Sequence, residues 1–186
     1  MTGKEQQAKK WGAKRIDALQ LKQNIWFEFA EIEDNYSTIN LGQGHVDFLA
    51  PKFVTRELSK AALSSDPMLN QYNIRRSGHP RLINILSRLY SNITQHNVDG
   101  DNEILITVGA SEALQCAILG HVDPGDEVII IEPFYDFYPS MLSLANGIPV
   151  YVPLRLKSGS RSSRNFMLDE NELESKFSSK TKMIIL

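Results

Sequence analysis

The sequence contains very little cysteine: Cys116 is the only one among 186 residues. A single cysteine excludes an internal disulfide and is typical of a reducing compartment. We therefore expect a cytoplasmic protein, with a mitochondrial one as the alternative. Because Cys116 lies in an apolar helical segment, we expect it to be a buried small hydrophobic residue rather than a nucleophile.

The sequence also lacks an excess of charge and any long apolar run. Twenty basic and 22 acidic residues give a formal net charge of −2. This balance is not the basic footprint of a protein that binds nucleic acid or an anionic membrane surface. No apolar run approaches the roughly 18 residues of a membrane-spanning helix. We therefore expect no nucleic-acid partner and no membrane association.

Metal-ligand spacing is absent as well. The four histidines are His45, His79, His96 and His121, and no two of them are spaced as zinc ligands usually are. The sequence therefore predicts no metal site.

Two kinds of apolar segment alternate along the chain. Helical periodicity and proline or glycine boundaries predict helices at 51–63, 80–93, 111–119, 138–145 and 169–177. Short β-branched runs predict strands at 104–108, 128–131, 148–154 and 182–186. Strands that are apolar on both faces and alternate with helices favour an α/β fold with a mostly parallel sheet. Because the last strand ends the chain, we expect a sheet that is incomplete at its carboxyl end.

Two further segments lie outside this regular alternation of helices and strands. Residues 15–34 predict an irregular helical arm with Ile25, Trp26 and Phe29 as its apolar contacts. Residues 157–164, rich in serine, arginine and glycine, predict an exposed loop.

The segment Thr107-Val108-Gly109-Ala110-Ser111-Glu112-Ala113 joins a predicted strand to a predicted helix. A helix start presents unpaired backbone N–H groups and a positive dipole end, which together bind phosphate. Gly109 permits a tight turn, and Ser111 supplies a hydroxyl as N-cap or phosphate donor. We interpret the segment as a candidate anion site.

An aromatic segment follows the next predicted strand. Glu132-Pro133-Phe134-Tyr135-Asp136-Phe137-Tyr138 has four aromatic residues, and they come at the carboxyl end of that strand. Such a cluster forms either a stacking wall for a planar ring or an aromatic cap over the core. A phosphate site beside it favours the first interpretation, because a phosphorylated aromatic cofactor needs both features.

Taken in their order along the chain, these two segments and several others resemble those of one protein family. From about Asn24 to Leu186 the chain is similar to the class I/II aminotransferases of the fold type I pyridoxal-phosphate group, and within it to the kynurenine aminotransferase and glutamine transaminase K branch. The matching residues are Asn40-Leu41-Gly42-Gln43-Gly44, Asn70-Gln71-Tyr72, Thr107-Val108-Gly109, Gly125-Asp126-Glu127-Val128-Ile129-Ile130-Ile131-Glu132-Pro133-Phe134 and Thr181-Lys182.

The resemblance implies an architecture. Residues 39–186 would be the first part of the large pyridoxal-phosphate-binding domain, a mostly parallel sheet with flanking helices. Residues 1–38 would be an N-terminal arm that belongs with the small domain.

The resemblance also implies pyridoxal 5'-phosphate as cofactor and a role for four residues in holding it. The backbone amides of Ala110 and Ser111 would bind its phosphate. Tyr135 would stack on its pyridine ring, where the branch often has phenylalanine. Tyr72 would reach the phosphate bound by a neighbouring subunit, which implies a homodimer.

On the substrate side, the resemblance implies an amino acid and a 2-oxo acid as reactants. Gly44 would border the substrate carboxylate, and Trp26 would line the substrate pocket. The branch usually has phenylalanine and proline after the second glycine, where this chain has His45 and Val46. Position 111 is aromatic in some members, so Ser111 weakens an assignment to kynurenine.

The catalytic half of the family's site matches nothing in the 186 residues. The aspartate that pairs with the pyridine nitrogen, the Schiff-base lysine and the carboxylate-binding arginine all follow, in the family, the strand that ends here at Leu186. Transamination needs that lysine. We therefore expect amino-group transfer as the family's function and no turnover by this chain alone.

Two alternatives stay open at this point. One is a truncated, non-catalytic chain that at most binds pyridoxal phosphate. The other is an α/β hydrolase in which Ser111, within Gly109-Ala110-Ser111-Glu112-Ala113, is the nucleophile. His121 is the one histidine that follows Ser111 in the chain.

Overall fold

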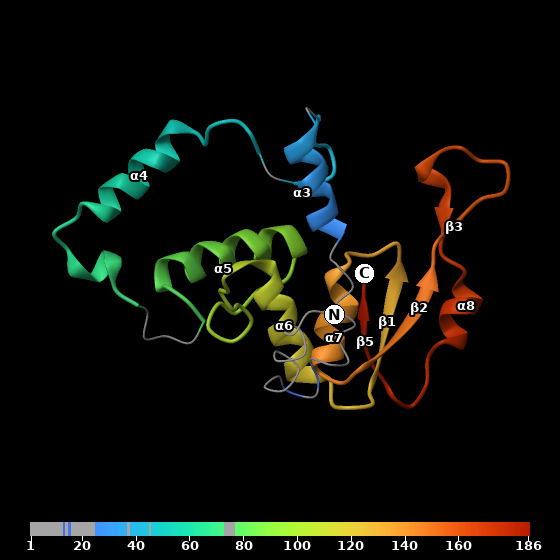
Figure 1. Cartoon of the computed structure of the whole chain (residues 1–186). Helices are drawn as coiled ribbons and strands as arrows, with labels where there is room; N and C mark the ends of the chain where they lie inside the picture. The colour runs from blue at the N-terminus through green and yellow to red at the C-terminus, as the bar shows by residue number, and fades with distance from the viewer. Residues whose placement is uncertain (1–12, 14, 16–24, 37, 45, 73–76) are drawn as a thin grey trace. The chain divides into compact units, whose positions relative to one another are not determined.

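The centre of the fold is strand β1 (Glu127–Glu132), which pairs on both sides. In this computed structural model, residues 13, 15, 25–36, 38–44, 46–72 and 77–186 are described. β1 runs parallel to β2 (Ile148–Pro153) and to β5 (Thr181–Ile185), in the order β2-β1-β5 (Figure 1). Ile129 lies opposite Val150 on one side and Ile184 on the other. The parallel α/β sheet predicted from the sequence is confirmed.

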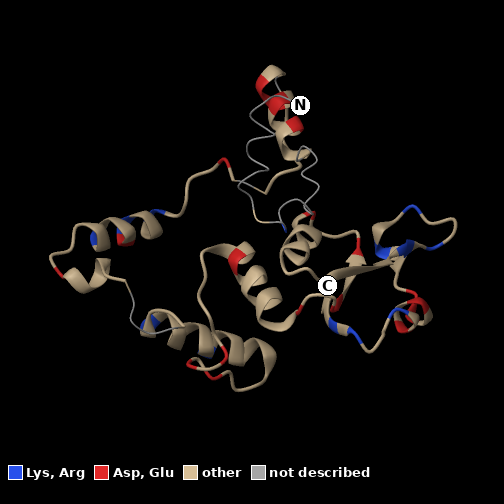
Figure 2. Ribbon diagram, turned by 60° about the horizontal axis from the view of Figure 1, so that its bottom comes forward, with Lys and Arg blue, Asp and Glu red and all other residues tan. Residues whose placement is uncertain are grey.

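A small hairpin and a short helix connect β2 to β5. Strands β3 (Arg155–Leu156) and β4 (Phe166–Met167) are antiparallel. Between them run the predicted exposed loop and the 3-10 turn η2 (Ser163–Asn165), and Figure 2 shows basic residues, coloured blue, along the ribbon of this hairpin. Helix α8 (Glu170–Ser175) follows, and the Arg155 guanidinium bonds its Glu172 carboxylate, with 3.2 Å between Nη2 and Oε1.

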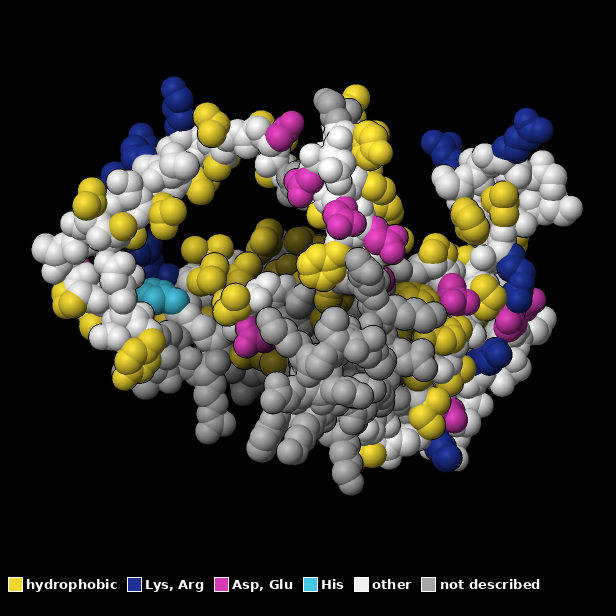
Figure 3. All heavy atoms as spheres, in the orientation of Figure 1, with side chains coloured by type: hydrophobic (Ala, Val, Ile, Leu, Met, Phe, Trp, Pro, Cys, Tyr) yellow, Lys and Arg dark blue, Asp and Glu magenta, His cyan; other side chains and the backbone are white. Residues whose placement is uncertain are grey.

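Residues Gln23–Ile106 form a compact unit of their own, distinct from that of Thr107–Leu186. It contains α3 (Ile25–Asn35), α4 (Lys52–Ala62), the 3-10 turn η1 (Pro67–Asn70) and α5 (Pro80–Thr94). Ile83 is the one buried hydrophobic residue among its described residues. Figure 3 shows apolar side chains at the surface of α3 and α4, so these helices have apolar sides that no described residue covers.

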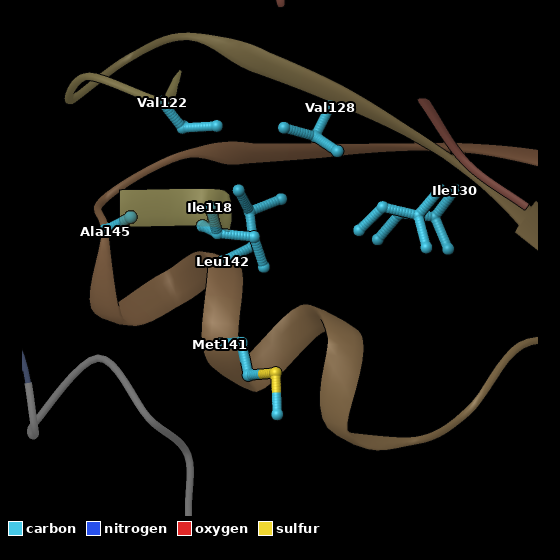
Figure 4. Close-up of a cluster of buried hydrophobic side chains, with 8 residues drawn as sticks. Ile118, Val122, Val128, Ile130, Met141, Leu142 and Ala145 are labelled. Atoms are coloured by element: carbon cyan, nitrogen blue, oxygen red, sulfur yellow. The ribbon is translucent and has the colours of Figure 1, made fainter. Parts of the chain in front are cut away.

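The main hydrophobic core lies between the sheet and two helices, α6 (Gly109–His121) and α7 (Phe137–Leu144). Val128 and Ile130 extend from β1 toward Ile118 of α6 and Leu142 of α7 (Figure 4). All four side chains are fully buried. Burial of each contributes about 1.5–3 kcal/mol relative to exposure, so this cluster holds the two helices on the sheet.

The strand predicted at 104–108 is wrong, because no described strand pairs with it. The Ile106 amide instead donates to the Ser77 carbonyl at 2.8 Å, and Val108 is exposed. An apolar β-branched run favours extended backbone, but it becomes a strand only beside a partner. The sheet takes its strands from residues 127–132, 148–153 and 181–185.

Two other expectations concern α3 and Cys116. The helical arm is confirmed at residues 25–35, whereas residues 16–24 of that prediction lie outside the described residues. The predicted burial of Cys116 is wrong, since the residue is exposed. It lies two positions before the buried Ile118 on α6, which places it on the opposite side of that helix.

No described helix is both long and apolar enough to cross a membrane. The division into an arm of residues 1–38 and a large domain of residues 39–186 stays a prediction.

Candidate functional site

The start of α6 has the backbone geometry that the candidate anion site requires. Gly109 has φ +82°, a conformation that side-chain-bearing residues rarely adopt. A Cβ atom built at this position would meet no heavy atom within 4 Å, so the space beside the turn is open. The Gly109 amide donates to the Thr107 carbonyl at 3.0 Å, and the Thr107 hydroxyl donates to the Gly109 carbonyl at 3.0 Å. This turn fixes where the first amides of α6 lie.

The amides of Ala110 and Ser111 belong to the first turn of α6, where helical N–H groups have no partner within the helix. Val108 is the N-cap and its side chain makes no capping bond. The predicted N-cap role of Ser111 is therefore wrong: the helix begins two residues earlier, at Gly109. Both residues are exposed, so their amides lie where an anion could accept from them.

Glu112 introduces a negative charge at the same helix end. Its carboxylate accepts a hydrogen bond from the Val108 amide, outside the first helical turn. An acidic residue in the first turn stabilises the helix dipole, but it opposes the binding of a second anion. A phosphate at this site would thus depend on several donors together.

The aromatic segment after β1 forms stacked pairs. Tyr135 lies against Phe137, with ring centroids 5.3 Å apart and planes inclined at 22°. Phe134 stacks on Tyr151 of β2 at 5.4 Å and packs against the main core. Burial raises the pKa of the Tyr151 hydroxyl, and the Glu132 carboxylate raises it further. The segment thus combines both interpretations: Phe134 caps the core, whereas Tyr135 keeps 46% of its surface exposed.

The hydrolase alternative finds no support in the geometry of α6. Ser111 lies in the first turn of the helix and His121 is its last residue. At about 1.5 Å per residue they are separated by roughly 15 Å along one rigid helix. The His121 ring is also within 2.8 Å of the Ala117 carbonyl, through Nδ1. These two residues cannot form a nucleophile–base pair.

In the unit of residues 23–106, a tight turn precedes Gly44. The Asn40 Oδ1 accepts from the amides of Gly42 and Gln43, both at 3.1 Å. Its Nδ2 donates to the Gln43 side chain at 2.8 Å and to the Glu33 carboxylate of α3 at 3.1 Å. The glycine segment is therefore fastened to α3 through one side chain.

A pocket of about 200 Å³ lies between α3 and this turn. Trp26, Phe29 and Ile32 line it from the helix, and Asn40, Gly42 and Gln43 from the turn. The Trp26 and Phe29 rings meet edge-on at 6.0 Å. Whole ligand pockets usually exceed about 300 Å³, so this one has room for part of a small molecule.

The other two residues predicted for this unit are exposed. A Cβ atom at Gly44 would meet nothing within 4 Å, and His45 beside it lies outside the described residues. Tyr72 follows η1 and is 80% exposed. The structure thus places Trp26 on a pocket wall, Gly44 just beyond it, and Tyr72 on the surface.

The six predicted site residues divide between the two units. Ala110, Ser111 and Tyr135 belong to one unit, and Trp26, Gly44 and Tyr72 to the other. Sequence reasoning missed the anchoring role of Asn40, although an asparagine two residues before a glycine is a usual signal for such a turn. Among the described residues, no group of three histidines, cysteines or carboxylates could hold a metal ion.

Comparison with known proteins places these features in context. The family model for class I and II aminotransferases matches residues 36–186. Kynurenine--oxoglutarate transaminase 3 of Rattus norvegicus is 50% identical over 177 residues, which are 94% of this chain and 38% of the rat protein. Kynurenine--oxoglutarate transaminase 1 of Homo sapiens is 41% identical over 183 residues, 96% of this chain and 42% of the human protein.

The solved structures that match this chain are also aminotransferases. Bna3p of Saccharomyces cerevisiae matches with a TM-score of 0.82 at 31% identity, covering 94% of this chain and 43% of Bna3p. YbdL of Escherichia coli, for which a methionine aminotransferase function is described, matches with a TM-score of 0.77 at 26% identity over 93% of this chain and 42% of YbdL. The chain therefore spans about two fifths of the length of these relatives.

Proposed function

The chain belongs to the class I and II aminotransferase family. On that premise, we propose that it forms the cofactor-binding part of a pyridoxal-phosphate site. The reaction would be amino-group transfer between an amino acid and a 2-oxo acid, as in kynurenine and glutamine transaminases. The observation that carries this proposal is the start of α6, where Gly109 at φ +82° leads into the exposed first-turn residues Ala110 and Ser111.

The residues present fit the cofactor. The open space beside Gly109 and the first-turn amides suit a phosphate group, because a helix N-terminus offers both hydrogen-bond donors and a positive dipole end. The half-exposed Tyr135 ring offers a face to a planar aromatic group. When bound, pyridoxal phosphate supplies the electron sink on which amino-group transfer depends.

The chain's own residues would bind and orient. The Ala110 and Ser111 amides would hold the phosphate, and the Ser111 hydroxyl could add a donor. Tyr135 would keep the ring in one plane. On the substrate side, Trp26 would exclude water from the pocket along α3, and Gly44, which has no side chain, would leave room for the substrate carboxylate.

Tyr72 would complete a neighbouring subunit's phosphate site, so the working enzyme would be a homodimer. Its 80% exposure is consistent with a residue that acts outside its own subunit.

The experiment that tests this function is a graft. This chain would replace the aligned 177 residues of rat transaminase 3, which are half identical to it. We expect the graft to bind pyridoxal phosphate and to transfer amino groups. We expect the 186-residue chain alone to show no turnover, because the family's catalytic lysine matches none of its residues. Turnover by the chain alone, or a folded graft that binds no cofactor, would contradict the proposal.

A pair of substitutions in the graft tests the role of Tyr135. Tyr135→Leu removes the stacking face and should weaken cofactor binding about threefold to tenfold, since an aromatic pair contributes about 0.5–1.5 kcal/mol. Tyr135→Phe keeps the ring and should bind nearly as well as the parent. Equal binding by the Leu and Phe variants would show that the ring does not stack on the cofactor. A graft that binds the cofactor but shows no turnover would instead favour the alternative of a non-catalytic chain that at most binds pyridoxal phosphate.

A further inference from the structure

The Asn40 side chain uses its whole hydrogen-bonding capacity. A carboxamide has one oxygen that accepts twice and one nitrogen that donates twice. Asn40 Oδ1 accepts from the Gly42 and Gln43 amides, and Nδ2 donates to the Gln43 side chain and to Glu33. Aspartate could keep the two acceptor bonds but neither donor bond, and a shorter hydroxyl side chain could not make all four. Asparagine supplies all four bonds at this position.

Three of the four bonds lie within the turn, and the fourth joins the turn to α3, the other wall of the pocket. Glu33 belongs to α3, which also carries Trp26 and Phe29, whereas Gly42 and Gln43 belong to the turn that leads to Gly44. The bond from Asn40 to Glu33 fastens the turn directly to α3. The distance between Trp26 and the glycine segment therefore depends on this side chain.

We propose that Asn40 is a positioning residue, which ties the Trp26-bearing helix to the glycine turn and so sets the width of the substrate pocket. Asn40 itself lines the pocket, but the role assigned to it is to hold Trp26 and Gly44 in place rather than to act on the reacting atoms. The consequence for substrate binding rests on the function proposed above, whereas the tether itself is a property of this chain alone.

Asn40→Asp breaks the tether with the smallest change of shape. The new carboxylate keeps the bonds to the two backbone amides but places two negative groups where a donor and an acceptor now lie 3.1 Å apart. Glu33→Gln in the same chain restores a bond of reversed polarity, because the carboxamide introduced on α3 can donate to the carboxylate introduced in the turn. The double variant should therefore recover what Asn40→Asp loses.

Trp26 reports on the tether directly. The sequence has two tryptophans, and Trp11→Phe leaves Trp26 as the single fluorophore. In that background of the 186-residue chain, Asn40→Asp should shift Trp26 emission to the red and raise its quenching by acrylamide. The Asn40→Asp/Glu33→Gln double variant should return both to the parental values. Asn92→Asp, the same chemical change at an exposed position of α5, is the matched control and should leave both unchanged.

A pH profile separates this tether from a general loosening. Two carboxylates in contact raise the pKa of one of them, so in Asn40→Asp a single shared proton should rejoin the new carboxylate to Glu33 as the pH falls from about 7 toward 4.5. At low pH, quenching of Trp26 in Asn40→Asp should then approach that of the parent. Quenching in the parent and in the double variant should depend little on pH. Quenching in Asn40→Asp that equals the parent's at pH 7, or that the double variant fails to rescue, would overturn the proposal.

The graft into rat transaminase 3 tests the consequence for substrate. Asn40→Asp should raise KM for the amino substrate severalfold with a smaller change in kcat, and the double variant should recover it. A Trp26 response with unchanged KM would confine Asn40 to a structural role and refute the positioning claim. An inactive parental graft would count against the proposed function, while the fluorescence of the chain would still decide on the tether.

Discussion

At the scale of single residues, the backbone of Gly109 is the feature on which the candidate phosphate site depends. Its positive φ turns the chain so that the Ala110 and Ser111 amides begin α6 at an exposed end. For a residue with a Cβ, this conformation costs roughly 1–2 kcal/mol, although the Cβ atom would clash with no neighbouring atom. The requirement for glycine is thus one of conformation rather than of space.

Two glycine substitutions in the same helix should therefore have opposite effects. Gly109→Ala should lower the free energy of unfolding by roughly 1–2 kcal/mol. Gly120→Ala, one residue before the end of α6 and also free of contacts, should be neutral or raise it by up to about 1 kcal/mol, because alanine favours the helix. Urea unfolding followed by circular dichroism measures both, and a shift of the same sign for both would contradict this account.

Sequence reasoning reached some residues and not others for physical reasons. Gly109 could be predicted, because a glycine before a helix is a local signal. The N-cap role predicted for Ser111 is wrong, because a serine two residues inside a helix gives the same sequence signal as one directly before its start. Asn40 was missed as an anchor, since its bond to Glu33 joins residues that are near in space through a turn whose shape the sequence does not display.

At the scale of elements, partners decide what a segment becomes. Residues 128–131 and 104–108 are both short apolar runs, yet only the first pairs on two sides and is a strand. The helices were easier to predict, because their hydrogen bonds are internal and their apolar faces recur in the sequence. Strand pairing depends on segments that are distant in the sequence, and the apolar periodicity of one segment does not indicate its partner.

The main core makes β1 sensitive to truncation. Ile130→Ala should lower the free energy of unfolding by about 2–5 kcal/mol, because it opens a cavity among fully buried side chains. Ile148→Ala, on the neighbouring strand but 44% exposed, is the matched control and should cost much less. Chemical unfolding compares the two, and equal losses would show that the cluster is not the stabilising centre.

The ion pair between the hairpin and α8 should depend on pH. The Arg155 guanidinium lowers the pKa of Glu172 below its ordinary value of 4.5. Its contribution is therefore present above that value and is lost as the pH falls through the lowered pKa. At neutral pH, Glu172→Gln should reduce amide protection in β3 and β4, and the difference from the parent should vanish in acid.

Hydrogen exchange measured at matched pH makes this comparison. Glu174→Gln, a charge removal on the same helix that leaves the pair intact, should have little effect. Because the Arg155 side chain is 58% exposed, solvent screens the pair and the effect should be confined to the hairpin. A difference that persists below the lowered pKa would mean that the Glu172 side chain acts by packing instead.

At the scale of the whole molecule, the chain matches only part of the length of its relatives. It covers 38% of rat transaminase 3 and 43% of Bna3p, and many apolar side chains of its described residues are exposed. The family could be predicted from the sequence, because several motifs of one family occur along the chain in the family's order. The substrate could not, since relatives with this fold include both kynurenine and methionine aminotransferases.

The parallel pairing of β1 also orders events during synthesis. Its neighbour β2 follows after one helix, whereas β5 is added only after the hairpin and α8. On the ribosome, α6, β1, α7 and β2 can pack while one edge of β1 still waits for its partner, exposing backbone groups that another chain could join. Once β5 has paired, β1 is covered on both sides, and β2 and β5 become the outer strands of the described sheet.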